Sequence, residues 1–347
     1  MSKNEQDAAV RSGLRAGALL DHDHVDSTWN RAAAATAQGD PFCCRTEWAL
    51  SFHEVFLPDR PVHLVESCGS VVAFCERTYH DLGRVLEPVE SSWRFGCPLL
   101  GDRAVELLEA FVATLPQRLQ KAPLLVSGLL PDSAVAASLW RRFHRRYDMF
   151  QLDPAVQSSA SLDGGLDGWL SRRSSHFRRR LMATVRRADD RAITFERHQP
   201  RDEASALSIY DRMLAVELAS WKGIGECGMA VGGSREFYRA MLLRLTRSAC
   251  ARVMFARHDG TDIGYVFGGI AGSVYRGQQF SYAEAFRSSS IGNLLQWEQL
   301  RWLCDEGIAR YDMGPKMEYK VHWTEVETTM DSWLLQPRSV SPARSRA

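Results

Sequence analysis

Two periods of hydrophobic and polar positions alternate along most of the chain. Segments with an apolar residue at every second position, typical of strands, alternate with segments whose apolar residues recur at helical spacing. This alternation predicts a mixed α/β fold. The first 25 residues and the residues after Gln336 are polar and carry little pattern, so we predict disordered tails at 1–25 and 337–347.

Part of this pattern occurs twice, at one fixed offset. VHLVESCGSVVAFC (62–75) aligns without gaps on VMFARHDGTDIGYV (253–266), and each predicts a hairpin with a glycine in its turn, Gly69 or Gly260. At the same offset LLGDRAVELL aligns on SIGNLLQWEQ, each with a glycine, Gly101 or Gly292, where a helix should start. A short strand pattern follows each helix. We therefore predict that the chain is built of two similar halves that meet near residue 155, at 26–155 and 156–336.

Composition narrows the class of protein. The longest apolar runs are far shorter than the roughly 20 residues that a membrane-spanning helix needs, and the N-terminus has no apolar core, so we predict a cytoplasmic protein without a membrane span. None of the eight cysteines has C-x-x-C spacing, which favours free thiols over a metal site or disulfides. A net charge of +1 argues against nucleic-acid binding through a wholly basic surface.

Most of the positive charge is arginine. The chain has only five lysines, three of which lie in or beside segments rich in reactive side chains: Lys222, Lys316 and Lys320. The segment 166–198 predicts a helix with a buried stripe of Phe177, Leu181 and Val185, followed by a strand. Its other faces are dense in arginine. They are either a solvated surface or a platform for the phosphates of a nucleotide-bearing or RNA-linked donor.

Three further segments carry candidate chemistry. In AVELASWKGIGECG, Glu217 and Trp221 share a helical face next to Lys222, which suits either plain packing or a lid that stacks on a ligand. In RSSSIGN, the residues Ser288 to Ser290 and Gly292 open a helix, as caps or as an anion site.

The third segment, YDMGPKMEYKVHW (311–323), is the densest. Asp312 ends a strand, and Glu318, Tyr319, Lys320, His322 and Trp323 follow on a loop or short helix. A carboxylate facing amine and phenol donors is a plausible acid/base site, whereas an ion-paired strand end is the structural alternative.

Taken in order, these segments resemble the GNAT superfamily, in particular the acetyltransferase domain of CelD-type proteins associated with cellulose biosynthesis, which is related to the Fem aminoacyltransferases. The family pattern of serine-x-glycine, then D-x-G, then Tyr-Lys and tryptophan is matched by Ser290 and Gly292, Asp312 and Gly314, and Tyr319, Lys320 and Trp323. The match covers roughly 165–335. The resemblance implies two tandem GNAT-like domains, a degenerate first one and a catalytic second one, each a mixed, mostly antiparallel sheet flanked by helices.

The resemblance also implies acyl transfer from acyl-CoA to an amine of a small molecule or peptide. Donor anchoring would fall to Arg287, Ser288, Ser290, Gly292 and Asn293, and polarisation of the acyl group to the strand at 281–283. Glu318 or Asp312 would be the base and Tyr282 or Tyr319 the acid, while Lys320 would stabilise the oxyanion. Glu217, Trp221, Lys222, His322 and Trp323 would contact the substrate, and no metal is expected.

Other interpretations stay open. The acyl-CoA fingerprint of the wider superfamily, Arg/Gln-x-x-Gly-x-Gly/Ala, is absent, and Ile291 stands where the family usually has proline. The donor is then either acyl-CoA, an aminoacyl-tRNA that contacts the arginine-rich helix at 171–191, or a carrier-protein thioester. The fold is also compatible with a catalytically inactive binding module. The acceptor is not specified, and a monomer or a homodimer is expected.

Overall fold

The computed structural model describes residues 15–16, 22–37 and 39–338. It divides the chain into two compact units. Unit 1 contains the residues up to 50, residues 57–155 and those from 329 on, and unit 2 contains residues 51–56 and 156–328. One of the breaks between these units lies at 155/156, and the predicted domain boundaries stay predictions. The predicted second domain of 156–336 differs at its end, because its last strand crosses into unit 1.

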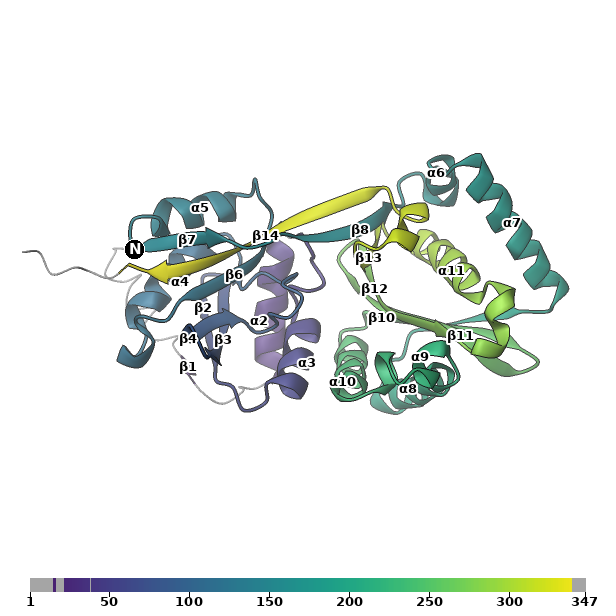
Figure 1. Cartoon of the computed structure of the whole chain (residues 1–347), viewed down its shortest axis with the longest axis horizontal. Coiled ribbons are helices and arrows are strands. Elements are labelled where there is room, and N and C mark those ends of the chain that lie inside the picture. Colours follow the sequence, from purple (N-terminus) through teal and green to yellow (C-terminus); the bar gives the residue numbers. More distant parts are fainter. Residues whose placement is uncertain (1–14, 17–21, 38, 339–347) are drawn as a thin grey trace, which may run out of the picture. The chain divides into compact units, whose positions relative to one another are not determined.

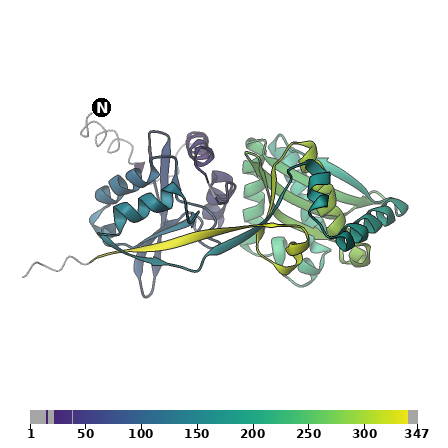
Figure 2. The ribbon, with the colours of Figure 1, turned by 90° about the horizontal axis from the view of Figure 1, so that it is seen from above.

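Unit 1 is a mixed sheet with helices packed on it (Figure 1). Its strands pair in the order β1-β2-β3-β4-β6-β14-β7, and among the described strands of this unit only the β4–β6 contact is parallel. The strands are β1 Arg15–Ala16, β2 Val62–Ser67, β3 Ser70–Tyr79, β4 Gly83–Pro88, β5 Leu99–Leu100, β6 Leu124–Leu129, β7 Tyr147–Gln151 and β14 Val326–Pro337. The helices are α2 His22–Ala35, α3 Thr46–Phe56, α4 Ala104–Thr114, η1 Gln117–Leu119 and α5 Ala134–Phe143. Helices α4 and α5 lie side by side (Figure 2).

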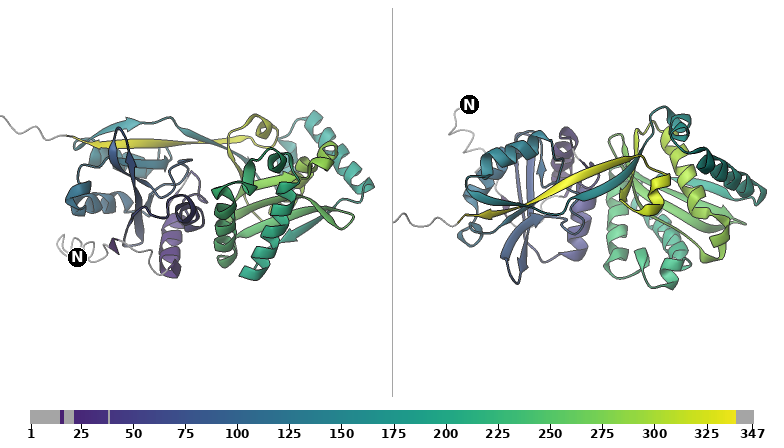
Figure 3. Two further views of the ribbon diagram at one scale, coloured as in Figure 1. Left: turned by 60° about the horizontal axis from the view of Figure 1, so that its bottom comes forward. Right: turned by 45° about the horizontal axis from the view of Figure 1, so that its top comes forward.

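Unit 2 has a sheet in the order β8-β13-β12-β11-β10-β9, and only the β12–β13 contact is parallel among its described strands. The strands are β8 Ala155–Ser161, β9 Thr194–His198, β10 Ala251–His258, β11 Thr261–Ala271, β12 Val274–Tyr282 and β13 Arg310–Pro315. The helices are α6 Gly165–Ser171, α7 Ser175–Asp190, α8 Glu203–Leu218, α9 Trp221–Ile224, η2 Gly228–Ala230, α10 Gly233–Arg247, η3 Glu284–Ser289, α11 Ile291–Asp305 and η4 Glu318–His322. Helix α11 covers one face of β10–β12, and α8 and α10 cover the other (Figures 1 and 3).

The predicted fold class is therefore confirmed: each unit is a mostly antiparallel sheet flanked by helices. The paired hairpins are also present, as β2–β3 and β10–β11. In both turns the two central residues have positive φ, 49° and 74° at Cys68 and Gly69, and 47° and 74° at Asp259 and Gly260. These are the values of the tight hairpin turn that glycine favours.

The second part of the repeat aligns less well than the sequence suggested. Gly101 precedes α4 with a φ of 90°, whereas Gly292 lies inside α11. The positive φ before α11 belongs to Ser290 instead, at 56°. The two glycines therefore have different structural roles.

The predicted tails are only partly testable. Residues 1–14, 17–21 and 339–347 lie outside the described residues. Where the structure describes the first tail, residues 15–16 pair with β2 and α2 begins at His22, so the predicted disordered segment of 1–25 is too long. In the described part of the chain no helix is both long and apolar enough to cross a membrane.

Candidate active site

The site begins where two strands of unit 2 diverge. Strands β12 and β13 pair only over 274–276 and 310–312. Beyond this point β12 stays paired with β11 on its far side, and β13 stays paired with β8. The facing edges of 277–282 and 313–315 thus have no strand partner, so their backbone groups are open to side chains of the protein or to a ligand.

A bulge distorts β12 at the start of this opening. Gly268 pairs with Gly277 and Phe267 pairs with Gln279, so Gln278 has no opposite residue. A β-carbon on Gly268 would lie 2.2 Å from the carbonyl oxygen of Arg276 and 2.5 Å from the ring of Tyr275. Glycine at 268 therefore permits the bulge.

We expect Gly268→Ala to lower the free energy of unfolding by roughly 2–3 kcal/mol, as overpacking of a close contact does. Gly272→Ala is a suitable control because its β-carbon would meet open space, although its φ of 60° costs about 1 kcal/mol. Urea unfolding of both variants measures the difference. Equal losses would show that the bulge does not depend on Gly268.

A buried ion pair lies at the point of divergence. The Arg276 guanidinium donates to Asp312 Oδ1 at 2.7 Å, and the same oxygen accepts a hydrogen bond from the Gly314 N–H at 2.7 Å. Both side chains are almost fully buried. This is the ion-paired strand end that the sequence offered as the structural alternative. Because Asp312 is buried and its Oδ1 already accepts two hydrogen bonds, it suits this structural role, and its role as general base stays a prediction.

The amine and phenol follow on η4. Lys320 is buried and donates from Nζ to the Pro315 carbonyl at 2.6 Å. Burial, helped by the nearby charge of Arg276 and opposed by Asp312, lowers the pKa of Lys320 to about 8. Tyr319 is half-exposed, its ring lies 6.4 Å from that of Phe280, and desolvation raises its pKa. Glu318 lies on the surface at the start of η4.

A cavity of about 560 Å³ joins three of the segments that the sequence singled out. It is lined by α7, the start of α11 and η4, through Phe177, Arg180, Leu181, Ala183, Thr184, Arg187, Ser290, Asn293, Tyr319, His322 and Trp323. We call this cavity the donor pocket, after the donor-binding role that the sequence predicts for these segments. Arg180, Thr184 and Arg187 are spaced to share one face of α7, so the pocket has two guanidinium groups on one wall.

The start of α11 forms another wall. The first N–H groups of an α-helix have no partner within the helix and carry the positive end of its dipole. Ser290 precedes them in a left-handed conformation and makes no side-chain cap. A β-carbon on Gly292 would lie 3.3 Å from the ring of Tyr282, so glycine here allows that aromatic residue to pack closely.

The predicted donor-anchoring residues are therefore only partly brought together. Ser290 and Asn293 line the donor pocket. Ser288 is exposed, and Arg287 is exposed and pairs with Glu284 at 3.2 Å, and neither lines the cavity. Gly292 acts through the packing of Tyr282. The roles of these residues toward a donor stay predictions.

The predicted shared helical face of Glu217 and Trp221 is wrong, while their roles toward a substrate stay predictions. Helix α8 ends at Leu218, and Ser220 caps the separate short helix α9 with hydrogen bonds from the N–H groups of Lys222 and Gly223. Glu217 is fully buried, where it accepts from the Tyr265 hydroxyl at 3.0 Å and the Met229 N–H at 2.9 Å, while Trp221 is 55% exposed. The serine before tryptophan interrupts the helix that spacing alone suggested.

Lys222 nevertheless reaches the open edge of β12. Its Nζ donates to the Phe280 carbonyl at 2.8 Å and to Gln279 Oε1 at 3.4 Å, and desolvation lowers its pKa. Glu217 Oε1 lies 4.0 Å from this amine. Lys222 therefore contacts the β12 side of the opening and is not among the residues that line the donor pocket.

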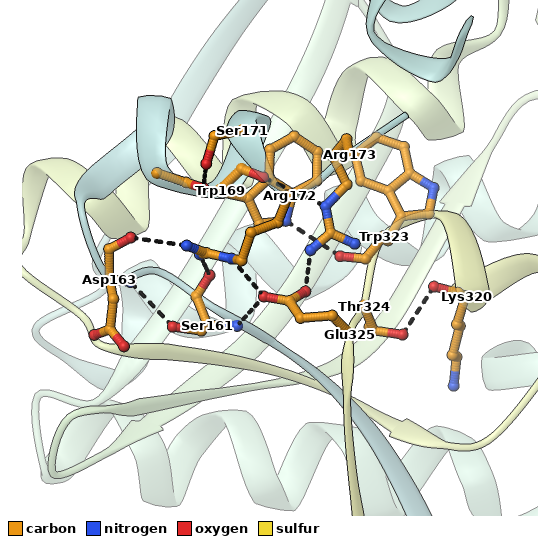
Figure 4. A network of polar contacts seen from close by, with 11 residues as sticks. Ser161, Asp163, Trp169, Ser171, Arg172, Arg173, Lys320, Trp323, Thr324 and Glu325 are labelled. Atoms are coloured by element: carbon orange, nitrogen blue, oxygen red, sulfur yellow. Dashed lines mark hydrogen bonds and ion pairs between the residues drawn. The ribbon is translucent and has the colours of Figure 1, made fainter. Parts of the chain in front are cut away.

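An aromatic stack supports the η4 side of the pocket. Trp323 stacks on the fully buried Trp169, with ring centroids 5.7 Å apart, and its carbonyl accepts from Trp169 Nε1 at 3.2 Å (Figure 4). Phe177 packs edge-on against Trp323 at 5.2 Å and stacks on His322 at 6.0 Å. His322 and Trp323 thus line the pocket partly because α6 and α7 hold them.

Unit 1 differs at the corresponding place. Its parallel strands β4 and β6 also part after a single pair, Leu86 with Leu124. Residues 95–97 lie against β6 just beyond this point: Ser127 Oγ donates to the Gly96 carbonyl at 2.7 Å, and a β-carbon on Gly128 would lie 2.6 Å from Gly96. In unit 1 the chain itself therefore occupies the position just beyond the divergence of β4 and β6.

Sequence reasoning missed two residues of the site. Arg276 stands in a strand pattern, VYRGQQF, where a charge on a buried strand is a signal for a buried partner. Glu325 follows the dense segment by two positions and binds two arginines. No spacing rule connects it with them, since they lie about 150 residues earlier in the chain. No group of three or more metal-ligating side chains occurs in the described part of the chain.

Comparison with known proteins agrees with this geometry. Residues 175–321 match the family described as acetyltransferase (GNAT) domain. Among solved structures, FemX is similar over 91% of this chain and 96% of its own, with a TM-score of 0.62 and 11% identity. A conserved protein of unknown function from Bacteroides thetaiotaomicron VPI-5482 is similar over 94% and 99%, with a TM-score of 0.60 and 9% identity.

L-PGS from Bacillus licheniformis is similar over 88% of this chain and 94% of its own, with a TM-score of 0.52 and 13% identity. At such identities the similarity to these structures shows the fold alone. A search of curated proteins found no match. The GNAT resemblance is thus confirmed at the level of the domain, while the more specific CelD-type resemblance stays a prediction.

Proposed function

With a GNAT acetyltransferase domain in residues 175–321 as the starting point, we propose that the protein is an N-acyltransferase that moves an acyl group from acyl-CoA to an amine. The observation that carries the proposal is the donor pocket beside the diverging strands. Its two arginines and the α11 N-terminus suit the phosphate groups of CoA, and its aromatic residues can stack on the adenine ring. The β12 edge suits the amide groups and thioester that follow the phosphates in CoA.

The reaction would use this chain's groups as follows. The neutral amine attacks the thioester carbonyl, the C–N bond forms, and the C–S bond breaks. Backbone N–H groups of the β12 edge and the ammonium of Lys320 would stabilise the oxyanion that develops. Tyr319 or Tyr282 would protonate the departing thiolate, and Glu318 is the remaining candidate to take the proton from the amine.

Calorimetric titration with acetyl-CoA and free CoA at two salt concentrations tests the donor. We expect micromolar binding, weakened about tenfold by Arg180→Ala and by Arg187→Ala, since each loses one charge-assisted contact with a phosphate. Arg178→Ala is the matched control because it lies on the same helix but outside the pocket lining. The variant Arg287→Ala tests the sequence-based anchoring prediction in the same assay.

If wild-type protein binds and both Arg180→Ala and Arg187→Ala bind equally well, the assignment of the donor to this pocket is contradicted. No binding of either CoA compound by folded protein would contradict the acyl-CoA donor. It would direct attention to a carrier-protein thioester, to aminoacyl-tRNA, or to a binding module without activity.

A second candidate is an aminoacyl-tRNA-dependent aminoacyltransferase. It is favoured by the exposed arginines of α7 outside the donor pocket, Arg178, Arg179 and Arg186, and by the similarity in fold to FemX. Contacts with many phosphates make binding fall steeply with salt, whereas binding of a single CoA falls less. Titration with a tRNA at the same two salt concentrations therefore separates the two donors.

A further inference from the structure

Glu325 joins three segments of unit 2 through one carboxylate. Its Oε1 accepts from Arg172 Nε at 2.9 Å and from the Ser161 N–H at 3.1 Å, and its Oε2 accepts from Arg173 Nη2 (Figure 4). Its own N–H donates to the Ser159 carbonyl at 3.2 Å. We call Glu325 with Arg172 and Arg173 the clasp. It links the end of β8, the turn between α6 and α7, and the residues just after η4.

The arginines of the clasp also hold their surroundings. Arg172 donates to the Ser161 carbonyl at 2.6 Å and the Asp163 carbonyl at 3.2 Å. Arg173 is buried, and its guanidinium lies over the Trp169 ring, 5.0 Å from the ring centroid. Trp169 in turn stacks on Trp323. A continuous set of contacts thus runs from the carboxylate to a residue of the donor-pocket wall.

The clasp connects two of the elements that line the pocket, α7 and η4. Arg173 precedes α7, which carries Arg180 and Arg187, and Glu325 follows η4, which carries Tyr319. A buried guanidinium that loses its carboxylate is destabilised, so neutralising Glu325 favours movement of the turn before α7 toward water. Movement of this turn would change the distance between the arginine wall and the aromatic wall.

From this arrangement we infer that Glu325 is a positioning residue for donor binding: it fixes α7 against η4 so that the phosphate-binding and base-stacking walls face each other. The inference rests on the proposed acyl-CoA function and goes beyond it, because Glu325 lies outside the pocket lining. It acts on the donor through Arg173, Trp169 and Trp323.

The substitution Glu325→Gln tests this role, since it keeps the size of the side chain and removes its charge. Glu327→Gln is the matched control, made two residues away on an exposed pair with Lys316. We expect Glu325→Gln to raise the acetyl-CoA dissociation constant about tenfold and to speed amide hydrogen exchange in α7 relative to α11 by a similar factor. The turnover number at saturating donor should change less than twofold. Glu325→Asp, which keeps a carboxylate, should recover part of the affinity.

Each outcome decides the inference. Unchanged affinity in Glu325→Gln overturns it, even where exchange in α7 becomes faster, because the clasp would then stabilise the fold without positioning the donor. Equal effects of Glu325→Gln and Glu327→Gln overturn it as well. Wild-type protein that binds no acetyl-CoA contradicts the proposed function, and the inference about donor binding falls with it. In that case an unchanged exchange rate of α7 in Glu325→Gln also rejects the structural link between α7 and η4.

Discussion

Replacing Lys320 with alanine is expected to lower the turnover number by about 100-fold or more, with the fold intact by circular dichroism. Lys320 Nζ uses one N–H on the Pro315 carbonyl, which fixes the amine and leaves two N–H groups for a developing oxyanion. Loss of one such donor in a dry site has an effect of this size in other acyl transfers. Lys316→Ala is the control, because Lys316 is exposed and pairs with Glu327.

The dependence on pH gives a second measure of the same role. The pKa of Lys320 is lowered to about 8, so its ammonium loses its proton as the pH rises through that value. If activity depends on the ammonium of Lys320, the turnover number of wild-type protein should fall above about pH 8. The pH profile of the Lys320→Ala variant should not show this fall. Wild-type turnover in Lys320→Ala would remove Lys320 from the mechanism.

Replacing Asp312 with alanine is expected to lower the free energy of unfolding by about 3–5 kcal/mol. The variant leaves the buried guanidinium of Arg276 without its carboxylate, and it removes the acceptor for the Gly314 N–H. Urea unfolding measures the loss. Asp305→Ala is the control: it breaks an exposed pair with Arg197, which is worth at most about 1 kcal/mol.

The double variant Arg276→Met, Asp312→Ala tests the cause. It removes both charges, so it should regain part of the stability that Asp312→Ala loses. Wild-type stability of Asp312→Ala combined with lost turnover would restore the carboxylate as the general base.

The sequence predicted those parts of the fold that depend on local patterns. Glycines at 69 and 260 between alternating strands specify two tight hairpins, since few other residues adopt positive φ readily. The helices and the short strands that follow them were also found at nearly the right positions. These features depend on residues that are close in the sequence, which is why one sequence is enough to predict them.

The candidate site was predictable in its segments but not in its partners. The arginine-rich helix, the serine-rich loop and the segment around Lys320 do line one cavity. The sequence could not show that Asp312 pairs with Arg276 across adjacent strands, because the register of a parallel pair depends on the whole sheet. In the sequence alone, an aspartate that acts as a general base cannot be distinguished from one that pairs with a buried arginine.

The error at Glu217 has a different origin. Helical spacing placed Glu217 and Trp221 together, but the hydroxyl of Ser220 caps a new helix and breaks that spacing. Capping competes with the continuation of a helix, and the better choice depends on tertiary contacts. Here the turn is fixed by pairing of Ser220 with Ala283 at the end of β12.

The tryptophan stack beside the donor pocket gives the protein an internal optical reporter. Trp323 lines the cavity and stacks on Trp169, which also lies 6.2 Å from Trp297, so three indole rings form one cluster. A ligand that enters the cavity changes the polarity around Trp323 and with it the emission of the cluster. Unlabelled protein can therefore report occupancy of this site in a fluorimeter, whichever donor is added.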